Sequence, residues 1–457
     1  MPVETAADRL LLHRARSHAL STRPPGPDTH PGPQVTPRTG PRVMPGRLPM
    51  HGGELLDLDA LLRRSLAAHD PADGRLRGVP SAGGLHPVDA HVLAGPGCTV
   101  PPGRYAYDPV AHHLVLRGPA PADAPEGALV VLTVTARRTV SHYGHRAWPL
   151  LLLDTGHAMA GLLTAAGEHG VGAGVEWCLD ADADLLAAAG GMDPGWGELP
   201  LAAVHLGLGG TGGGEAALAA WAHAGGVRDS GSVDPSGVSH PELRAAEEVL
   251  RLLGRAGGST TGTWRPGRVA VPPRSGRSAI PPLPGVPSTA QLAALLGVAG
   301  SVPGPRWCAA VGGPGPSVVE LGAGKRELTV LARGDARGTL AVWAARQGWL
   351  ADCGAVLLAY GCPLDAGPAQ VRRYHIAAGA GAGLAQAQAA ALGLRSRPVG
   401  SWQGADLGAA LGGPPQRDLI VHGLALGTTR APAQHPPTEG QLTAPDLAHA
   451  AESDRTP

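Results

Sequence analysis

The chain of 457 residues has no phenylalanine, no asparagine and a single lysine, Lys325, and aromatic residues make up only 3% of it. A core must therefore rest on Leu, Val, Ala and the nine tryptophans, and a hydrophobic content of 43% is enough for one. The 69 glycines and 46 prolines place the composition at the edge of the low-complexity range, so we expect disorder to be local. The length predicts two or three domains.

The chain has no excess of charge of either sign, because 37 Lys and Arg balance 37 Asp and Glu. This balance argues against a nucleic-acid-binding protein and against a polybasic protein of membrane surfaces. No run of 18 apolar residues is free of charge, so we expect no transmembrane helix. The first 20 residues hold acidic residues and no unbroken apolar stretch, unlike a secretory signal.

Cysteine is scarce too, and the five residues Cys98, Cys178, Cys308, Cys353 and Cys362 form no CxxC pair. This predicts buried free thiols in a reducing cytoplasm rather than disulfides or a zinc site. The 20 histidines include no HExxH spacing, and the pairs His112/His113 and His142/His145 lie in polar, turn-rich stretches. We therefore predict no metal site.

Apolar periodicity divides the chain into five parts. We expect a Pro-rich arm at 1–47, a first domain at 48–212, a linker at 213–240, a second domain at 241–430 and a disordered tail at 431–457. Within the first domain the patterns predict a helix from about 55, a hairpin over 103–118, a long apolar helix over 150–170, and strands over 88–94, 128–136 and 199–209.

The sequences of the two predicted domains resemble each other. At an offset of 229, Arg77 falls on Arg306, Gly83-Gly84 on Gly312-Gly313 and Pro87 on Pro316. At an offset of 223, Gly156 falls on Gly379 and Gly170-Val171 on Gly393-Leu394. Similar segments in the same order predict an internal duplication.

Three segments could carry chemistry. In RxxPSAGGLHP, Arg77 to Pro87, the two glycines would let the backbone approach a flat ligand, and Ser81 offers a hydroxyl. In RSGRS, Arg274 to Ser278, two arginines around a serine could clamp a phosphate. In HYGHR, His142 and Tyr143 could move protons and Arg146 could hold an anion. Spacing alone also fits an ordinary glycine turn and two polar loops, and His157 fits a satisfied core histidine.

The order of these motifs resembles a known family. The PSAGGLHP loop, the GRYAYDPVAHHL hairpin, then YGHRAW, a GHAMAGLLTA helix and EW are similar to SagB/McbC-type dehydrogenases of the nitroreductase superfamily, over roughly residues 15–210. In the second half, RSGRS is similar to the phosphate-binding RRSxR loop of that superfamily, and GLRSRPVGSW to a segment near its flavin. The resemblance implies an α+β fold, FMN held at a dimer interface, and oxidation of azolines to azoles in ribosomally made peptides.

Applied to two copies in one chain, the resemblance implies tandem nitroreductase-like domains that form an internal pseudo-dimer. The half that keeps PSAGGLHP lacks the RRSxR start, whereas the half that keeps RSGR has a degraded loop, AAVGGPGP. We therefore expect one composite FMN site and a second, dead one. In the composite site, the FMN phosphate would be held by Arg274, Ser275 and Arg277. The flavin ring would be held by Pro80, Ser81, Ala82, Gly83 and Gly84.

The family credits a Lys-Tyr pair with proton transfer, and this chain has His142-Tyr143 at the matching place. The change fits either altered chemistry or lost activity. The expected partners are a modified precursor peptide and a cyclodehydratase, and the chain would be a monomeric pseudo-dimer or a homo-oligomer. Two alternatives stay open: a flavin oxidoreductase acting on another small substrate, and a non-catalytic scaffold of a peptide-modifying complex.

Overall fold

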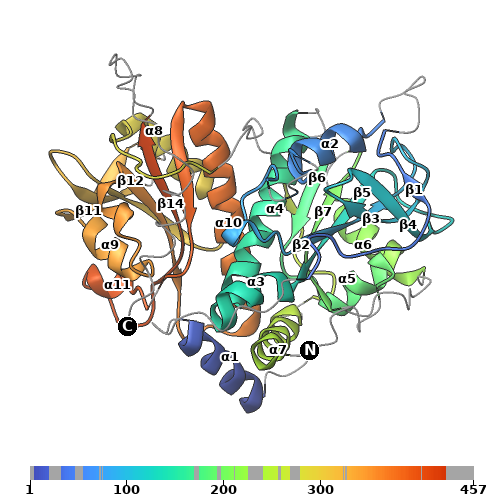
Figure 1. Ribbon diagram of the computed structural model, residues 1–457, viewed down its shortest axis with the longest axis horizontal. Coiled ribbons are helices and arrows are strands. Elements are labelled where there is room, and N and C mark those ends of the chain that lie inside the picture. The colour runs from blue at the N-terminus through green and yellow to red at the C-terminus, as the bar shows by residue number, and fades with distance from the viewer. Residues whose placement is uncertain are drawn as a thin grey trace, which may run out of the picture.

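A computed structural model gives the fold of most of the chain. It describes residues 5–19, 32–46, 55–70, 74, 76–168, 174–192, 197–209, 212–224, 240–255, 259–267, 278–322, 324, 327–402 and 404–428. The predicted tail at 431–457 and the RSGR segment at 274–277 lie outside these residues. Helices and strands form two α+β units side by side, each with its own sheet (Figure 1).

The first unit is built on an eight-stranded sheet in the order β1-β4-β3-β2-β5-β7-β6-β8. Its strands are β1 Arg42–Val43, β2 Val88–Ala94, β3 Gly103–Asp108, β4 His113–Pro119, β5 Ala128–Thr135, β6 Val175–Cys178, β7 Glu198–Leu206 and β8 Arg265–Pro266. The helices are α1 Ala6–Ala19, α2 Leu58–Ser65, η1 Ala82–Gly84, α3 Ala136–Tyr143, η2 Gly144–Arg146, α4 Ala147–Glu168, α5 Ala183–Gly190, α6 Gly214–His223 and α7 Pro241–Gly254. The strands, the hairpin and the long helix predicted from the sequence are confirmed, with ends shifted by a few residues at most.

The second unit is built on a six-stranded sheet in the order β11-β10-β9-β12-β14-β13. Its strands are β9 Arg306–Val311, β10 Ser317–Leu321, β11 Leu328–Arg333, β12 Ala355–Cys362, β13 Leu394–Val399 and β14 Leu419–Thr428. Its helices are α8 Thr289–Ala299, α9 Arg337–Trp343, η4 Gly348–Asp352, α10 Pro368–Ala391 and α11 Leu407–Ala410.

The six central strands of the first sheet follow the same order as those of the second, because β4-β3-β2-β5-β7-β6 matches β11-β10-β9-β12-β14-β13. In each unit a long buried helix, α4 or α10, connects the fourth of these strands to the sixth. The two helices pack on each other between the sheets, as Figure 1 shows at its centre. The predicted fold class, tandem units in an internal pseudo-dimer, is therefore confirmed.

The strand order corrects one part of the sequence alignment of the two halves. β9 takes the place of β2, so Gly312-Gly313 form the turn after that strand, whereas Gly83-Gly84 precede β2. The 229-residue register is therefore wrong, because composition matched a glycine turn with a glycine loop. The 223-residue register matches α4 to α10 and is consistent with their packing; its Gly170-Val171 match lies outside the described residues.

The described residues at the two ends of the predicted linker 213–240 belong to α6 and to the start of α7, which pack on the first unit. α6 buries Leu218 and Trp221 in a cluster with residues of the first sheet, and α7 contacts β7 and α3. β8 pairs with β6, so residues 265–266 extend the first sheet although they follow residue 241. In the described part of the chain, the second unit's own elements begin with α8.

All five cysteines are buried and unpaired, as predicted. The continuous helical stretch Ala136–Glu168 is apolar and long enough to cross a membrane, but 94% of its most apolar window is buried inside the protein. It therefore has the burial of a central core helix, packed against α10, α2 and β7.

Candidate functional site

A cavity of about 380 Å³ lies where the two units meet. The first unit lines it with the loop Pro80–Gly84 and with residues of α3, η2 and α4: Tyr143, Arg146, Leu150, Leu153, Asp154 and His157. The second unit lines it with Ser278, Ala345, Gln347, His422 and the end of β13 and the residues after it, Arg397, Pro398, Gly400 and Ser401. Neither unit encloses the cavity alone.

The glycine loop forms the first unit's wall in a backbone conformation that favours glycine. Gly83 has φ 62° and Gly84 has φ 64°, both in the left-handed region. A Cβ on Gly83 would lie 3.2 Å from the Tyr143 hydroxyl oxygen, so a side chain there would crowd the cavity. The structure therefore brings together all five residues predicted for the ring side, Pro80 to Gly84. Their role as flavin contacts stays a prediction.

Ser81 and Asp154 fix this loop to α4. The Ser81 hydroxyl donates a hydrogen bond of 2.6 Å to the Asp154 carboxylate, and the Ala82 N–H donates to both carboxylate oxygens at 3.2 Å. The Ser81 oxygen also accepts the His86 N–H at 3.0 Å. The loop is thus held by side chains of its own unit.

The structure places Tyr143 and His142 differently. Tyr143 ends α3 with its side chain on the cavity, and burial, followed by the nearby Asp154 carboxylate, raises the pKa of its phenol. His142 is exposed and does not line the cavity; its ring packs edge-on against Tyr143 with ring centres 4.7 Å apart. Tyr143 is therefore the one of the two that can meet a bound molecule directly in this arrangement.

The predicted phosphate residues Arg274, Ser275 and Arg277 lie outside the described residues. The next residue along the chain, Ser278, lines the cavity. Arg397 of β13 donates to the Ala279 carbonyl at 3.3 Å and also lines the cavity. The first described residue after the RSGR segment therefore lines the cavity.

Sequence reasoning missed two cavity residues, Asp154 and His422, and read His157 as a core histidine. It included Arg397 only as part of the GLRSRPVGSW segment. His157 of α4 and His422 of β14 join the two units through an Nε2···Nε2 hydrogen bond of 3.0 Å. Burial lowers the pKa of His422 to about 3, so this ring is neutral at physiological pH. One signal was available: Asp154 and His157 interrupt an apolar helix three residues apart, which places both on one face.

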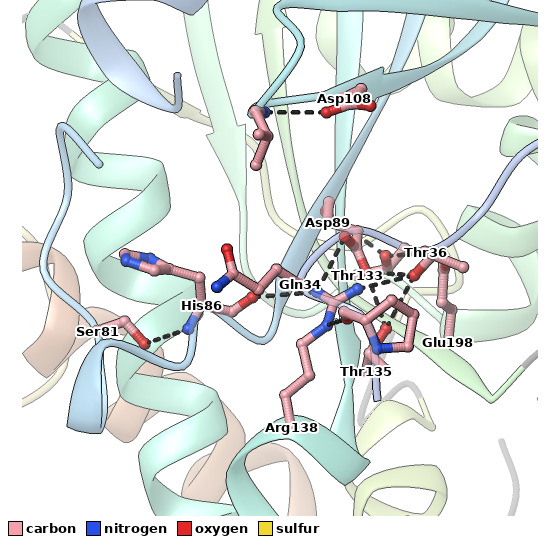
Figure 2. A network of polar contacts seen from close by, with 12 residues as sticks. Gln34, Thr36, Ser81, His86, Asp89, Asp108, Thr133, Thr135, Arg138 and Glu198 are labelled. Carbon is pink, nitrogen blue, oxygen red and sulfur yellow. Dashed lines mark hydrogen bonds and ion pairs between the residues drawn. The ribbon is translucent and has the colours of Figure 1, made fainter. Parts of the chain in front are cut away.

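A second polar network ties the site to the N-terminal arm, as Figure 2 shows. The Arg138 guanidinium on α3 donates to the Asp89 carboxylate at 3.1 Å, to the His86 carbonyl at 3.0 Å and to the Thr36 hydroxyl at 2.9 Å. Arg138 and Asp89 are 2% and 8% exposed, so this ion pair is buried. One side chain on the helix that carries Tyr143 therefore holds both the arm and the segment directly after the glycine loop.

Arg372 on α10 occupies the position that matches Pro149 on α4. Arg372 lies one turn before Ile376, and Pro149 lies one turn before Leu153. Its side chain is 1% exposed and donates to the carbonyls of Leu201 at 3.1 Å and Gly254 at 3.0 Å. A buried guanidinium thus fills the space between α10, β7 and α7.

Comparison with known proteins identifies a fold for the chain but no family. No protein-family model matches the chain, and no curated protein matches it.

Solved structures do match. A candidate nitroreductase from Anabaena variabilis aligns with a TM-score of 0.57 and 18% identity, over 82% of this chain and 88% of that one. A candidate nitroreductase from Ralstonia eutropha aligns over 40% of this chain and 94% of its own, with 17% identity and a TM-score of 0.28. The E. coli microcin synthetase McbBCD complex with truncated pro-MccB17 bound aligns over 35% and 68%, with 18% identity and a TM-score of 0.28. The first of these alignments shows that the chain has a nitroreductase-like fold.

Proposed function

We propose that the protein is an FMN-dependent dehydrogenase that oxidises azolines to azoles in a ribosomally made, post-translationally modified peptide. The observation that carries this proposal is the composite cavity, in which the PSAGG loop of one nitroreductase-like unit faces the β13 end and Ser278 of the other. It is the arrangement that the motif order implies, and a cavity of about 380 Å³ is within the range of small-molecule sites.

The described residues fit a flat, anionic cofactor. Gly83 and Gly84 leave the loop without side chains where a ring would approach. Arg146 and Arg397 give the cavity positive charge, and the Arg146 Nε is buried without a hydrogen-bond partner among the described residues. Pro80 to Gly84 would hold the ring, and Arg274, Ser275 and Arg277 the phosphate.

FMN, when bound, would supply an acceptor for the hydride that leaves the azoline ring. The chain's own residues orient the substrate and manage the proton. The raised pKa of Tyr143 keeps its phenol protonated near neutral pH, so it donates a hydrogen bond to the substrate and does not act as the base. His142 does not line the cavity, so it does not contact the same atom in this arrangement.

The partners follow from the same proposal. A precursor peptide would present its azoline rings at the cavity, and a cyclodehydratase would form those rings. Because the chain itself supplies both units, we propose that a monomer suffices to form the site. We also propose that the protein acts in the cytoplasm.

The test is the purified protein. A yellow sample with one FMN per chain supports the cofactor, and a peptide that loses one H₂ per heterocycle supports azoline oxidation. A yellow sample that oxidises no azoline favours a flavin oxidoreductase with another substrate. A colourless sample that cannot be loaded with FMN contradicts the enzyme proposal and favours the scaffold.

A further inference from the structure

Asp154 is the only carboxylate that lines the cavity among the described residues. It lies on α4, is 4% exposed, and accepts hydrogen bonds from Ser81 and Ala82. No arginine, lysine or histidine in the described part of the chain lies within ion-pair distance of it. A buried carboxylate without a paired cation destabilises a fold, so packing alone does not account for an acid here.

The surroundings of Asp154 hold charges of both signs at longer range. On the cavity side are Tyr143, Arg146, His157, Arg397 and His422. On the opposite side, toward β2 and β3, are Arg77, His86, Asp89 and Tyr107. Burial outweighs the hydrogen bonds of Ser81 and Ala82 and raises the pKa of the Asp154 carboxyl to about 7, so both of its protonation states are accessible near neutral pH.

The hydrogen bonds of Ser81 determine where its hydroxyl proton points. Its oxygen accepts the His86 N–H, so its own proton points to Asp154 at 2.6 Å. The hydroxyl oxygen keeps one lone pair for a proton from the cavity. A proton that reaches Ser81 from that side can pass to the carboxylate.

The other cavity groups are poorly suited to accept a proton. Tyr143 is already protonated, because its pKa is raised by burial. His422 is part of a histidine pair in which one ring donates to the other, and burial disfavours its charged form by lowering its pKa to about 3. Arg146 and Arg397 are cations.

We propose that Asp154 is the proton acceptor of the cavity, reached through the Ser81 hydroxyl. The substrate in this proposal rests on the proposed function. The ring carbon next to the carbonyl loses its proton to Ser81 as the Ser81 proton moves to Asp154. The electron pair of that C–H bond forms the new ring double bond, and the neighbouring carbon releases a hydride, for which FMN, when bound, would be the acceptor.

The first test needs neither substrate nor flavin. The infrared spectrum of the ligand-free protein should contain a carboxyl band that titrates near pH 7, the value expected for Asp154. This band should be absent in Asp154→Asn, which keeps the shape of the side chain, and unchanged in the control Asp108→Asn at the end of β3. If wild type and Asp154→Asn show the same titration, the proposal is wrong.

The second test uses the flavin-loaded enzyme. Turnover of wild type should rise as the pH increases through about 7, because the acceptor must be ionised. Asp154→Asn should lower turnover about a hundredfold and flatten this limb, with flavin still bound. Asp154→Glu should restore part of the rate and a pH-dependent limb. A variant that keeps wild-type turnover and pH profile overturns the proposal.

Ser81→Ala tests the route independently and covers the case in which Asp154→Asn fails to fold. It leaves the carboxyl in place, so the infrared band should persist with a shifted midpoint while turnover falls. An unchanged midpoint contradicts the coupling between the two residues.

Failure of the proposed function would look different. Wild-type protein that binds no flavin, or oxidises no azoline, contradicts that function whatever Asp154 does. The infrared titrations of wild type, Asp154→Asn and Ser81→Ala then decide the proposal alone.

Discussion

Gly156 of α4 and Gly379 of α10 occupy reciprocal positions at the contact between the two helices. A Cβ on Gly156 would lie 2.1 Å from the carbonyl oxygen of Ile376, and a Cβ on Gly379 would lie 2.1 Å from that of Leu153. Ile376 follows Leu153 by the same 223 residues that separate the glycines. Each helix thus presents the same patch to the other, as in the interface of a two-fold symmetric dimer.

The first prediction concerns this contact. Gly156→Ala should lower the free energy of unfolding by about 1–3 kcal/mol, because the added methyl group meets backbone that cannot move alone. Chemical denaturation measures the change. Gly338→Ala on the exposed side of α9 is the control, since nothing lies within 4 Å of its added Cβ. Equal stability of the two variants would show that the helices are not in tight contact.

The second prediction concerns the cofactor's phosphate. Arg274→Ala combined with Arg277→Ala should abolish FMN retention, because the guanidinium pair is the expected phosphate clamp. The flavin-to-protein absorbance ratio after gel filtration measures retention.

Arg306→Ala is the control for that variant. Arg306 stacks on the Tyr360 ring and pairs with Asp418, away from the cavity, so its loss should leave flavin binding unchanged. Equal flavin loss from both variants, or two FMN per chain, would contradict a single composite site.

The third prediction concerns Tyr143. Tyr143→Phe should leave flavin bound and lower turnover by about tenfold to a hundredfold, because only the hydroxyl on the cavity is lost. Steady-state kinetics with the visible spectrum as a loading check measures both. Tyr374→Phe on α10, outside the cavity lining, should be neutral. Full activity of Tyr143→Phe removes this residue from the mechanism.

The fourth prediction concerns stability against pH. Burial lowers the pKa of His91 and His422 to about 3 and that of His375 to about 4. The unfolded chain binds protons below its ordinary histidine pKa of about 6.5, whereas the folded protein does not until the lowered values are reached. These histidines therefore make stability fall as the pH drops from about 6.5 toward about 4.

His375→Leu isolates one of these groups. It should reduce the dependence of unfolding free energy on pH by up to about 1.4 kcal/mol per pH unit in that window. Urea titrations at several pH values measure the slope. His13→Leu, at an exposed position of α1, should keep the wild-type slope. If His375→Leu keeps it too, then His375 is not held neutral by burial.

The fifth prediction concerns the arm. Arg138→Ala leaves the Asp89 carboxylate buried without its ion-pair partner, so unfolding free energy should fall by about 3–5 kcal/mol. Residues 32–46 should also become cleavable in limited proteolysis, because Arg138 holds Thr36. Arg244→Ala at an exposed position of α7 should have neither effect. A protected arm in Arg138→Ala would show that other contacts hold it.

The elements of the first unit could be predicted because their signals are local. The β-branched run at 128–135 and the apolar run at 150–168 each fit one kind of element. The register of the duplication could not be read in the glycine-rich segments, since Gly83-Gly84 and Gly312-Gly313 look alike but serve a loop and a turn. Only strand pairing separates the two.

The candidate site was predicted in part for a related reason. Pro80 to Gly84 and Tyr143 stand in recognisable motifs, and the cavity includes them. Asp154 and His422 stand in no motif, and each reaches the cavity through the folding of a separate element. Arg397 stands in the GLRSRPVGSW segment but was not singled out there. Their chemistry depends on burial and on contacts between residues far apart in the sequence, which the sequence does not display: Ser81 and Asp154 are 73 positions apart, and His157 and His422 are 265 apart.

The placement of both cavity walls in one polypeptide has a consequence for behaviour in solution. A pocket made by two separate subunits is lost when dilution separates them. Here the covalent connection keeps the walls at a constant effective concentration, so ligand affinity should not depend on how much protein is present.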